Sequence, residues 1–300
     1  MSSARLILLT LCLAISSNAL AWWNEEWSQR KQINIDTTPT GANTQVSLSE
    51  VPVLVRLHSG NFPQFLTVRD NGADFRFISG DDLTPLKYHV ERFDAVAELA
   101  YVWVQIPAIA PQSDQGSFYL YFGNQAAPKA DDPVSTFDVN TVAAFHFNET
   151  SGLPRDSTGY GTPVVSGQTF PNPASIIGQG ATLSGADALR IPFETAPQIA
   201  LNPETGWAFE AWVRLPGLPT EQAYLFDMND EAAGRLSITV GPAGLTASLD
   251  DAAVTSFTPI TAGNWHHVGL VLNAEGLQLY LDGAQVGGAQ VPVPALNADI

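Results

Sequence analysis

Two short runs of alternating apolar and polar residues near the end of the chain constrain its fold most strongly. They cover residues 265–272 and 277–281, and residues 273–276 supply Asn and Gly for a turn between them. Period-two alternation interrupted by turn residues is typical of a β-hairpin. A second turn at residues 282–283 leads into a further short strand at residues 284–286. The second half of the chain is therefore predicted to be built from antiparallel strands.

The composition also favours an all-β protein. The chain has 300 residues, of which 45% are hydrophobic and 14% charged, with 24 Gly and 21 Pro. This length allows two domains that each bury a core, and the low charge argues against disorder. The formal net charge of −17 argues against nucleic acid or anionic lipid as a partner, because both require clustered cations.

Residues 1–21 have the pattern of a signal peptide. Arg5 precedes an apolar run at residues 6–15, and small residues lead up to Ala21, after which we expect cleavage. An uncleaved anchor is the alternative, but the apolar run is shorter than the ~20 residues of a membrane span. The single cysteine, Cys12, lies within this leader, so the mature chain forms no disulfide. We expect export to the periplasm or cell surface of a bacterium.

The first predicted domain, residues 22–137, contains strands at roughly ten-residue spacing. They lie at residues 30–35, 51–57, 86–93, 100–106 and 117–122, and residues 70–77 resemble a loop that feeds a further strand. Strands spaced in this way predict a β-sandwich. Ahead of them stand Trp22, Trp23 and Trp27. These indoles either fold back to cover a sheet or stack against sugar, and the covering role is favoured.

An ordered set of motifs in this domain carries a resemblance to a known family. The motifs are Gly72-Ala-Asp-Phe-Arg-Phe77, Tyr88-x-Val-Glu91, Val102-Trp-Val104 and Tyr119-Leu-Tyr-Phe-Gly-Asn124. Together they resemble an uncharacterised bacterial family of exported β-sandwich domains, often placed before a laminin-G-like domain. That family offers no established catalytic residues. Within one motif lies Asp74, for which capping of a turn is favoured over binding of a hard cation.

The second predicted domain, residues 138–300, follows a proline-containing linker at residues 124–133. Further strands are predicted at residues 142–147, 207–215, 224–228, 235–240 and 245–249. The run at 207–215 is the strongest of them. Alternation places Trp207 and its apolar neighbours on one face and Glu210, Trp212 and Arg214 on the other.

Spaced motifs in this domain resemble the laminin-G-like, concanavalin A-like jelly-roll superfamily. The motifs are Phe145-x-Phe147, Asp156-Ser-x-Gly159, Phe209-Glu-Ala-Trp-Val213, Trp265-His-His-Val268 and Leu279-Tyr-Leu-Asp-Gly283. The resemblance implies two packed antiparallel sheets that bind carbohydrate or protein and sometimes hydrolyse glycans. Family members continue past the Leu-Asp-Gly turn into a closing strand that this sequence lacks. The expected fold is thus all-β, with two tandem β-sandwiches, the second a jelly roll lacking its closing strand. We expect the chain to be a piece of a longer protein.

The candidate site residues are carboxylates in loops. Asp156 and Asp282 are the candidate calcium ligands, because some members of the superfamily hold calcium with loop carboxylates; a structural role in turns is the favoured alternative. His266 and His267 are adjacent, so a strand directs them to opposite faces and they cannot chelate one metal. Glu210 stands alone, whereas glycoside hydrolysis requires two carboxylates.

The favoured function is therefore that of a non-catalytic, exported recognition or adhesion module. Its partner is expected to be a glycan or an envelope protein. Two alternatives stay open. The first is the extracytoplasmic part of a TolQ/ExbB-type envelope transport assembly, with a membrane proton-channel partner or fused segment, as the resemblance implies. The second is a glycan hydrolase with an atypical site.

Overall fold

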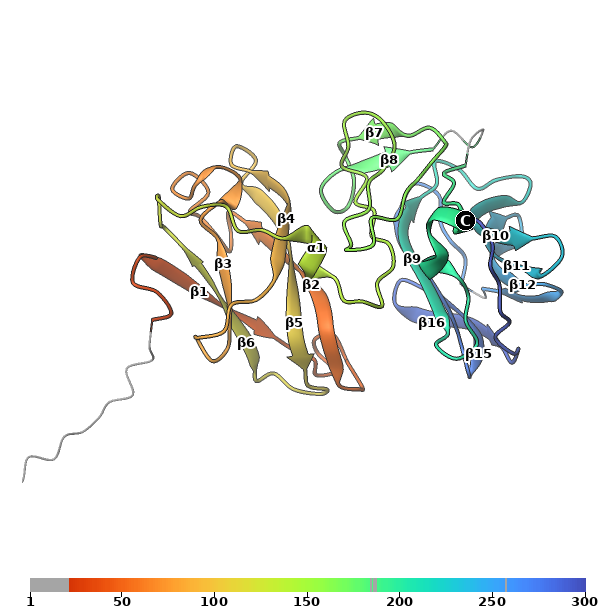
Figure 1. Ribbon diagram of the computed structural model, residues 1–300, viewed down its shortest axis with the longest axis horizontal. Helices are drawn as coiled ribbons and strands as arrows, with labels where there is room; N and C mark the ends of the chain where they lie inside the picture. The colour runs from red at the N-terminus through yellow and green to blue at the C-terminus, as the bar shows by residue number, and fades with distance from the viewer. Residues whose placement is uncertain (1–21, 184, 186–187, 257) are drawn as a thin grey trace, which may run out of the picture. The chain divides into compact units, whose positions relative to one another are not determined.

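The computed structural model describes residues 22–300 except residues 184, 186–187 and 257 (Figure 1). The predicted leader at residues 1–21 therefore lies outside the described residues. The described part is almost entirely β, with one four-residue α-helix, α1 (Pro133–Thr136). Over these same residues, no helix is both long enough and apolar enough to cross a bilayer.

The chain divides into two compact units that interleave along the sequence. Among the described residues, the first unit contains 22–49, 66–86 and 108–130, and the second contains 50–65, 87–107 and 131–300. The first unit holds one antiparallel sheet of order β1-β6-β3, formed by β1 (Gln29–Ile35), β6 (Gly116–Phe122) and β3 (Arg76–Ser79). The strands predicted near these positions are confirmed.

The tryptophans at the start of the described chain cover this sheet. Trp27 is buried and its Nε1–H donates to the Asp74 carbonyl at 2.7 Å. The rings of Trp22 and Trp23 lie edge-on to Tyr121 of β6, with centroids 5.2 and 5.6 Å away. Phe118, Leu120 and Phe122 are buried on one side of β6, and the tryptophan cover explains why Tyr121, on the other side, is buried too. The covering role of the tryptophans is confirmed.

Asp74 is a buried residue that joins two loops of the first unit. Its carboxylate accepts hydrogen bonds from the Arg69 and Gly123 amides at 3.0 and 2.7 Å. The carboxylate therefore satisfies backbone donors that would otherwise be stranded. The turn role favoured for Asp74 is confirmed.

The second unit begins with a sheet of order β2-β5-β4. Its strands are β2 (Leu48–His58), β5 (Leu99–Ile109) and β4 (Tyr88–Asp94). Val102, Val104 and Ile106 alternate along β5 and are buried. The antiparallel register of β4 and β5 sets His89 opposite Trp103, two residues before a register shift. This pairing positions the buried polar cluster described below.

Two four-stranded antiparallel sheets form a sandwich in the second half of the chain (Figure 1). One has the order β10-β11-β12-β13, with β10 (Ala223–Asp230), β11 (Gly234–Gly241), β12 (Gly244–Leu249) and β13 (Ala252–Thr255). The other has the order β16-β15-β14-β9, with β16 (Ala284–Ala289), β15 (Gly276–Leu281), β14 (Trp265–Asn273) and β9 (Trp207–Arg214). The predicted hairpin is confirmed as β14 and β15, whose pairing closes at Asn273 and Gly276.

The core of this sandwich is contributed by both sheets. Leu236 and Ile238 of β11 belong to one buried apolar cluster with Val268 and Leu270 of β14 and with Leu279 of β15. Alternating residues of facing sheets that interdigitate in this way are typical of aligned sandwich packing. The outer side of the β16-β15-β14-β9 sheet is thereby left for polar and aromatic side chains.

The predicted strand at residues 142–147 does not form. Only an isolated bridge joins Phe145 to Asp156, and the Asp156 carboxylate takes the Ala144 amide hydrogen at 2.8 Å. Phe147 adopts a φ of 54°, which no extended strand tolerates. Among the described residues between 148 and 206, the regular elements are the short strands β7 (Phe170–Asn172) and β8 (Gly180–Thr182) and the 3-10 turns η2 (Phe193–Thr195) and η3 (Pro197–Ile199).

Residues after β16 pair with the segment before β9. Leu201 and Leu296 exchange backbone hydrogen bonds of 2.9 and 3.1 Å, and Ile191 and Ile300 exchange bonds of 2.7 and 2.9 Å. Within the described residues no further strand follows β16, and the pairing of Leu201 with Leu296 is an isolated bridge. Arg190 also forms an ion pair with Asp299. The sequence did not predict these contacts.

Candidate functional site

The outer face of the β16-β15-β14-β9 sheet gathers aromatic and hydrogen-bonding side chains. We use the term outer face for six residues: Glu210, Trp212, His267, Gln278, Tyr280 and Gln285. On β9, exposure alternates residue by residue, with Trp207 and Phe209 packed on the core and Glu210, Trp212 and Arg214 exposed. This alternation was predicted from the sequence and is confirmed.

Cross-strand pairing lines these residues up across all four strands. Glu210 pairs with Gly269, Gly269 with Tyr280, and Tyr280 with Gln285. Paired residues of adjacent strands point to the same side of a sheet. Because Gly269 has no side chain, the sheet is notched between Glu210 and Tyr280; a Cβ there would lie 3.4 Å from the Tyr280 Cβ.

Trp212 is the exposed aromatic side chain of this face, and its neighbours hold it in place. It is 42% exposed, and the His267 ring lies beside it with a centroid separation of 5.2 Å. His267 Nε2 in turn lies 3.4 Å from Glu210 Oε2. The hydrogen bond from His267 lowers the pKa of Glu210. An indole ordered before a ligand arrives loses less conformational entropy on binding.

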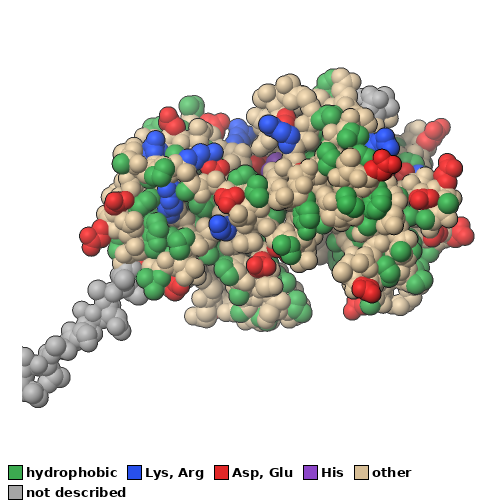
Figure 2. Space-filling model, in the orientation of Figure 1, with side chains coloured by type: hydrophobic (Ala, Val, Ile, Leu, Met, Phe, Trp, Pro, Cys, Tyr) green, Lys and Arg blue, Asp and Glu red, His purple; other side chains and the backbone are tan. Residues whose placement is uncertain are grey.

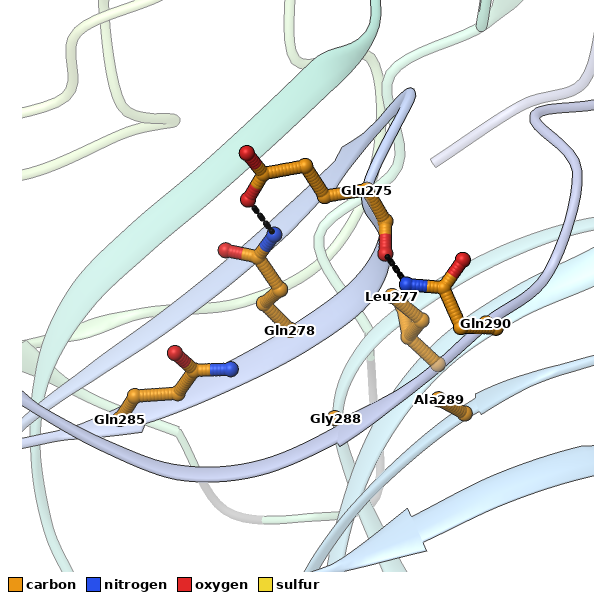
Figure 3. A pocket seen from close by; sticks show the side chains of 7 residues that line it. All are labelled: Glu275, Leu277, Gln278, Gln285, Gly288, Ala289 and Gln290. Atoms are coloured by element: carbon orange, nitrogen blue, oxygen red, sulfur yellow. Dashed lines mark hydrogen bonds between the residues drawn. The ribbon is translucent and has the colours of Figure 1, made fainter.

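A glutamine-rich pocket lies on the same sheet at the β15–β16 end. It is lined by Glu275, Leu277, Gln278, Gln285, Gly288, Ala289 and Gln290 (Figure 3). The Gln278 amide donates to the Glu275 carboxylate at 3.2 Å, and the Gln290 amide donates to the Glu275 carbonyl at 2.7 Å. Figure 3 shows the Gln285 side chain without a bond to these residues. Amide groups both donate and accept hydrogen bonds, so this pocket offers both to a ligand.

The adjacent histidines of β14 point to opposite sides, as predicted. His266 lies on the inward side, where its Nδ1 is 2.8 Å from Asp282 Oδ2 and its Nε2 is 2.8 Å from the Thr261 hydroxyl. The other oxygen of Asp282 accepts the His267 amide at 2.9 Å. Partial burial raises the pKa of Asp282, but the hydrogen bonds from His266 and the His267 amide more than offset it, so the net pKa is lowered.

Asp156, the other candidate calcium ligand, organises its own loop. Its Oδ1 accepts the Ala144 and Thr158 amides at 2.8 and 2.9 Å, and its Oδ2 accepts the Thr158 hydroxyl and the Thr162 amide at 2.6 and 2.8 Å. Both Asp156 and Asp282 therefore have the contacts of turn-forming residues. Across the described part of the chain, no three His, Cys, Asp or Glu side chains converge on a point that could hold a metal ion. Calcium binding at Asp156 or Asp282 stays a prediction.

A buried polar cluster in the second unit was not predicted. We call Glu91, His146 and His89 the histidine array. His89 Nε2 lies 3.0 Å from His146 Nε2, and His146 Nδ1 lies 3.3 Å from Glu91 Oε2. The Trp103 indole donates to this same Oε2 at 2.6 Å.

The surroundings of the array exclude water from His89. This residue is only 4% exposed, and the Phe137 ring covers both imidazoles with centroid distances of 5.6 and 6.2 Å. Burial and, secondly, the neighbouring His146 lower the pKa of His89 to about 3. Among the described residues, His89 Nδ1 is a buried side-chain atom with no hydrogen-bond partner.

Two family matches cover separate parts of the chain. Residues 71–162, which include the whole array, match the family described as a domain of unknown function (DUF2341). The outer face lies within a second match. Residues 184–299 match the concanavalin A-like lectin/glucanases superfamily. The predicted order, a DUF2341 domain followed by a concanavalin A-like domain, is confirmed.

Other comparisons add little to these two matches. No curated protein matches the chain. Among solved structures, mouse laminin α1 chain domains LG4-5 share 9% identity with a TM-score of 0.25, covering 89% of this chain and 80% of that one. Truncated AlyQ with CBM32 and alginate lyase domains shares 15% identity with a TM-score of 0.27, covering 91% and 82% respectively. Scores this low carry no argument about the concanavalin A-like domain or its ligand.

Proposed function

We propose that this protein is a non-catalytic recognition module exported to the bacterial cell envelope, and that its concanavalin A-like domain binds a glycan on the outer face. The carrying observation is the exposed Trp212, with the His267 ring beside it, on a face that also carries Tyr280, Gln285 and the mostly buried Gln278. The superfamily is named for lectins and glucanases, which supports a carbohydrate ligand. Export rests on the leader predicted from residues 1–21.

The chemistry of the outer face suits a sugar ring. A pyranose has an apolar C–H face that packs against a flat aromatic ring, and a rim of hydroxyl groups that donate and accept hydrogen bonds. Trp212 supplies the ring, and the amides of Gln278 and Gln285 supply hydrogen-bond partners. Tyr280 presents its hydroxyl to Gln278 at 2.7 Å, which orients that amide before a ligand binds.

The charge of the domain favours a neutral glycan over a polyanionic one. Residues 138–300 contain 16 Asp and Glu residues against four Arg residues and no Lys. On the face shown in Figure 2, acidic side chains are scattered and basic ones form no patch over this domain. A sulfated or uronic-acid polymer would be repelled by such a surface at low ionic strength.

Binding of the full chain to soluble neutral polysaccharides by isothermal titration calorimetry tests this proposal. Trp212→Ala is expected to weaken binding at least tenfold, equivalent to about 1.4 kcal/mol. The matched control is Tyr224→Ala, which removes another exposed aromatic residue, 50% exposed, from β10 of the opposite sheet. This variant should bind like the wild type.

Three results would contradict the proposal. The first is equal loss of binding in both variants, or binding that survives Trp212→Ala, because the outer face would then not be the site. The second is release of reducing sugar from a bound polysaccharide by the wild type, because the module would then be catalytic. The third is binding to no glycan, because the outer face would then lack its proposed ligand.

A further inference from the structure

The protons of the histidine array can be assigned from its hydrogen bonds. An indole nitrogen only donates, so Glu91 Oε2 accepts from Trp103. The 3.3 Å contact of this oxygen with His146 is attractive when His146 carries its hydrogen on Nδ1. His146 Nε2 then offers a lone pair, and His89 donates its Nε2 hydrogen to it across 3.0 Å. We call this arrangement, with residues 137–147 against β4, the closed form. It contains two neutral imidazoles.

A further proton, added to the two neutral imidazoles, has no favourable position in this arrangement. On His89 Nδ1 it would create a buried cation whose new N–H group has no acceptor. On His146 Nε2 it would make that nitrogen a donor, so His89 would have to accept at Nε2 and carry its own hydrogen on the buried Nδ1, again without an acceptor. Either position costs free energy that disappears once the rings separate and reach water.

We propose that the Glu91–His146–His89 array is a proton-binding switch. Uptake of one proton beyond those of the two neutral imidazoles, in mild acid, releases residues 137–147 from β4. His146 and Phe137 both belong to the segment that moves, and His89 and Glu91 both belong to β4. The segment is suited to release because it is held by no strand pairing beyond the single bridge of Phe145. In sequence it follows α1 and precedes the residues that match the concanavalin A-like superfamily.

The other charged groups near the array are already engaged. Next to Glu91 on β4, Arg92 pairs with Asp94 and donates to the Gly178 carbonyl. Lys87 pairs with Asp132, which caps α1, and the Asp138 carboxylate accepts from Thr141.

The remaining described neighbours of the array lie on β5 and in the loop before β8, and none of them is charged. On β5, Trp103 is uncharged, and the Tyr101 hydroxyl donates to the Ile176 carbonyl at 3.4 Å. Gly178 packs so closely that a Cβ there would lie 2.9 Å from Glu91 Oε1. Glu91 is therefore the charged group in contact with the imidazoles.

The direction of the pH effect follows from linkage. An imidazole whose pKa is lowered in the closed form stabilises that form fully above about pH 6.5, and the stabilisation is lost as the pH falls toward 3. The equilibrium constant for opening should therefore rise about tenfold per pH unit between pH 6 and 4.5. This window lies above the ordinary pKa values of Asp and Glu side chains, about 3.9 and 4.3, and only its lower end overlaps the titration of Glu side chains.

Hydrogen–deuterium exchange of the full chain, corrected for intrinsic rates, measures this opening. Peptides covering residues 137–147 should exchange about 30-fold faster at pH 4.5 than at pH 6, and peptides from β11 should not change. His89→Leu removes the imidazole whose added N–H group has no acceptor, and should reduce the pH slope of the exchange of 137–147. The matched control His58→Asn removes a histidine of β2 whose Nδ1 accepts the Gly60 amide, and should keep the wild-type response.

A second measurement keeps the proposal open to refutation if His89→Leu fails to fold. Imidazole ¹⁵N NMR of the wild type should show His89 neutral in the closed form at pH 4.5. The proposal is overturned if His89 is protonated there while residues 137–147 stay protected. It is also overturned if exchange of 137–147 is equal at pH 6 and 4.5, or if His89→Leu retains the wild-type pH slope.

Discussion

The histidines of β14 and those of the histidine array have similar partners but opposite environments. His266 and His267 are adjacent in sequence and face opposite sides of a strand, so each has its own carboxylate, Asp282 or Glu210. His89 and His146 are 57 positions apart, and their rings meet at 3.0 Å beside a single carboxylate. The first arrangement separates two titrating groups, whereas the second couples them.

Burial determines what each arrangement can do. Glu210 has an 80% exposed side chain, so its contact with His267 is screened by water and serves mainly to position Trp212. The carboxylate of Glu91 is almost fully buried. Removal of any residue of the histidine array therefore leaves the polar groups of the others buried without a hydrogen-bond partner. Three substitutions, one at each carboxylate of this comparison, test the contrast.

The largest effect is expected at Glu91. Glu91→Ala leaves the Trp103 and His146 donors buried without an acceptor, so the free energy of unfolding should fall by about 3 kcal/mol. Urea unfolding at pH 7 measures this change. Glu91→Gln retains an amide oxygen for Trp103 and should lose about half as much. A Glu91→Ala variant within about 0.5 kcal/mol of the wild type would mean that the array contributes nothing to stability.

A smaller effect is expected at Asp282. This residue has a φ of 51° in the turn between β15 and β16, and its carboxylate holds both His266 and the His267 amide. Asp282→Ala loses both hydrogen bonds and introduces a residue that tolerates positive φ less well, for a combined loss of about 2 kcal/mol. Asp282→Gly also loses both hydrogen bonds, but glycine adopts the positive φ without strain. If glycine and alanine destabilise equally in thermal unfolding, backbone strain is not part of the effect.

The strands could be predicted where alternation and turn residues agree. The β9 pattern and the β14–β15 hairpin are examples, because one face of each is buried against a single core. Prediction failed at residues 142–147, where a distant carboxylate, Asp156, takes the Ala144 amide hydrogen that a strand would use. Local apolar alternation contains no information about such a competitor.

The same distinction separates the two candidate sites. The outer face follows from the periodicity of one strand, so Glu210 and Trp212 could be assigned to it from the sequence. The array depends on a contact between β4 and a segment without regular structure, 57 residues later. His89 lies between Tyr88 and Val90, and His146 lies between Phe145 and Phe147. A titratable residue within each apolar run was the sequence signal that could have indicated a buried polar site. The sequence spacing did not show that the two histidines contact each other.

The smallest effect on stability is expected at Glu210. Glu210→Ala removes an exposed contact with His267, so the free energy of unfolding at pH 7 should change by less than about 0.5 kcal/mol. Because His267 lowers the pKa of Glu210, the contribution is present above about pH 4.5 and is lost as the pH falls below it. The variant should nevertheless weaken glycan binding measurably, since His267 then no longer holds the Trp212 ring. If both the glycan affinity and the stability are unchanged, the Trp212 ring does not depend on the Glu210–His267 contact for its position. The backbone of the sheet would then be sufficient to position the side chains of the outer face.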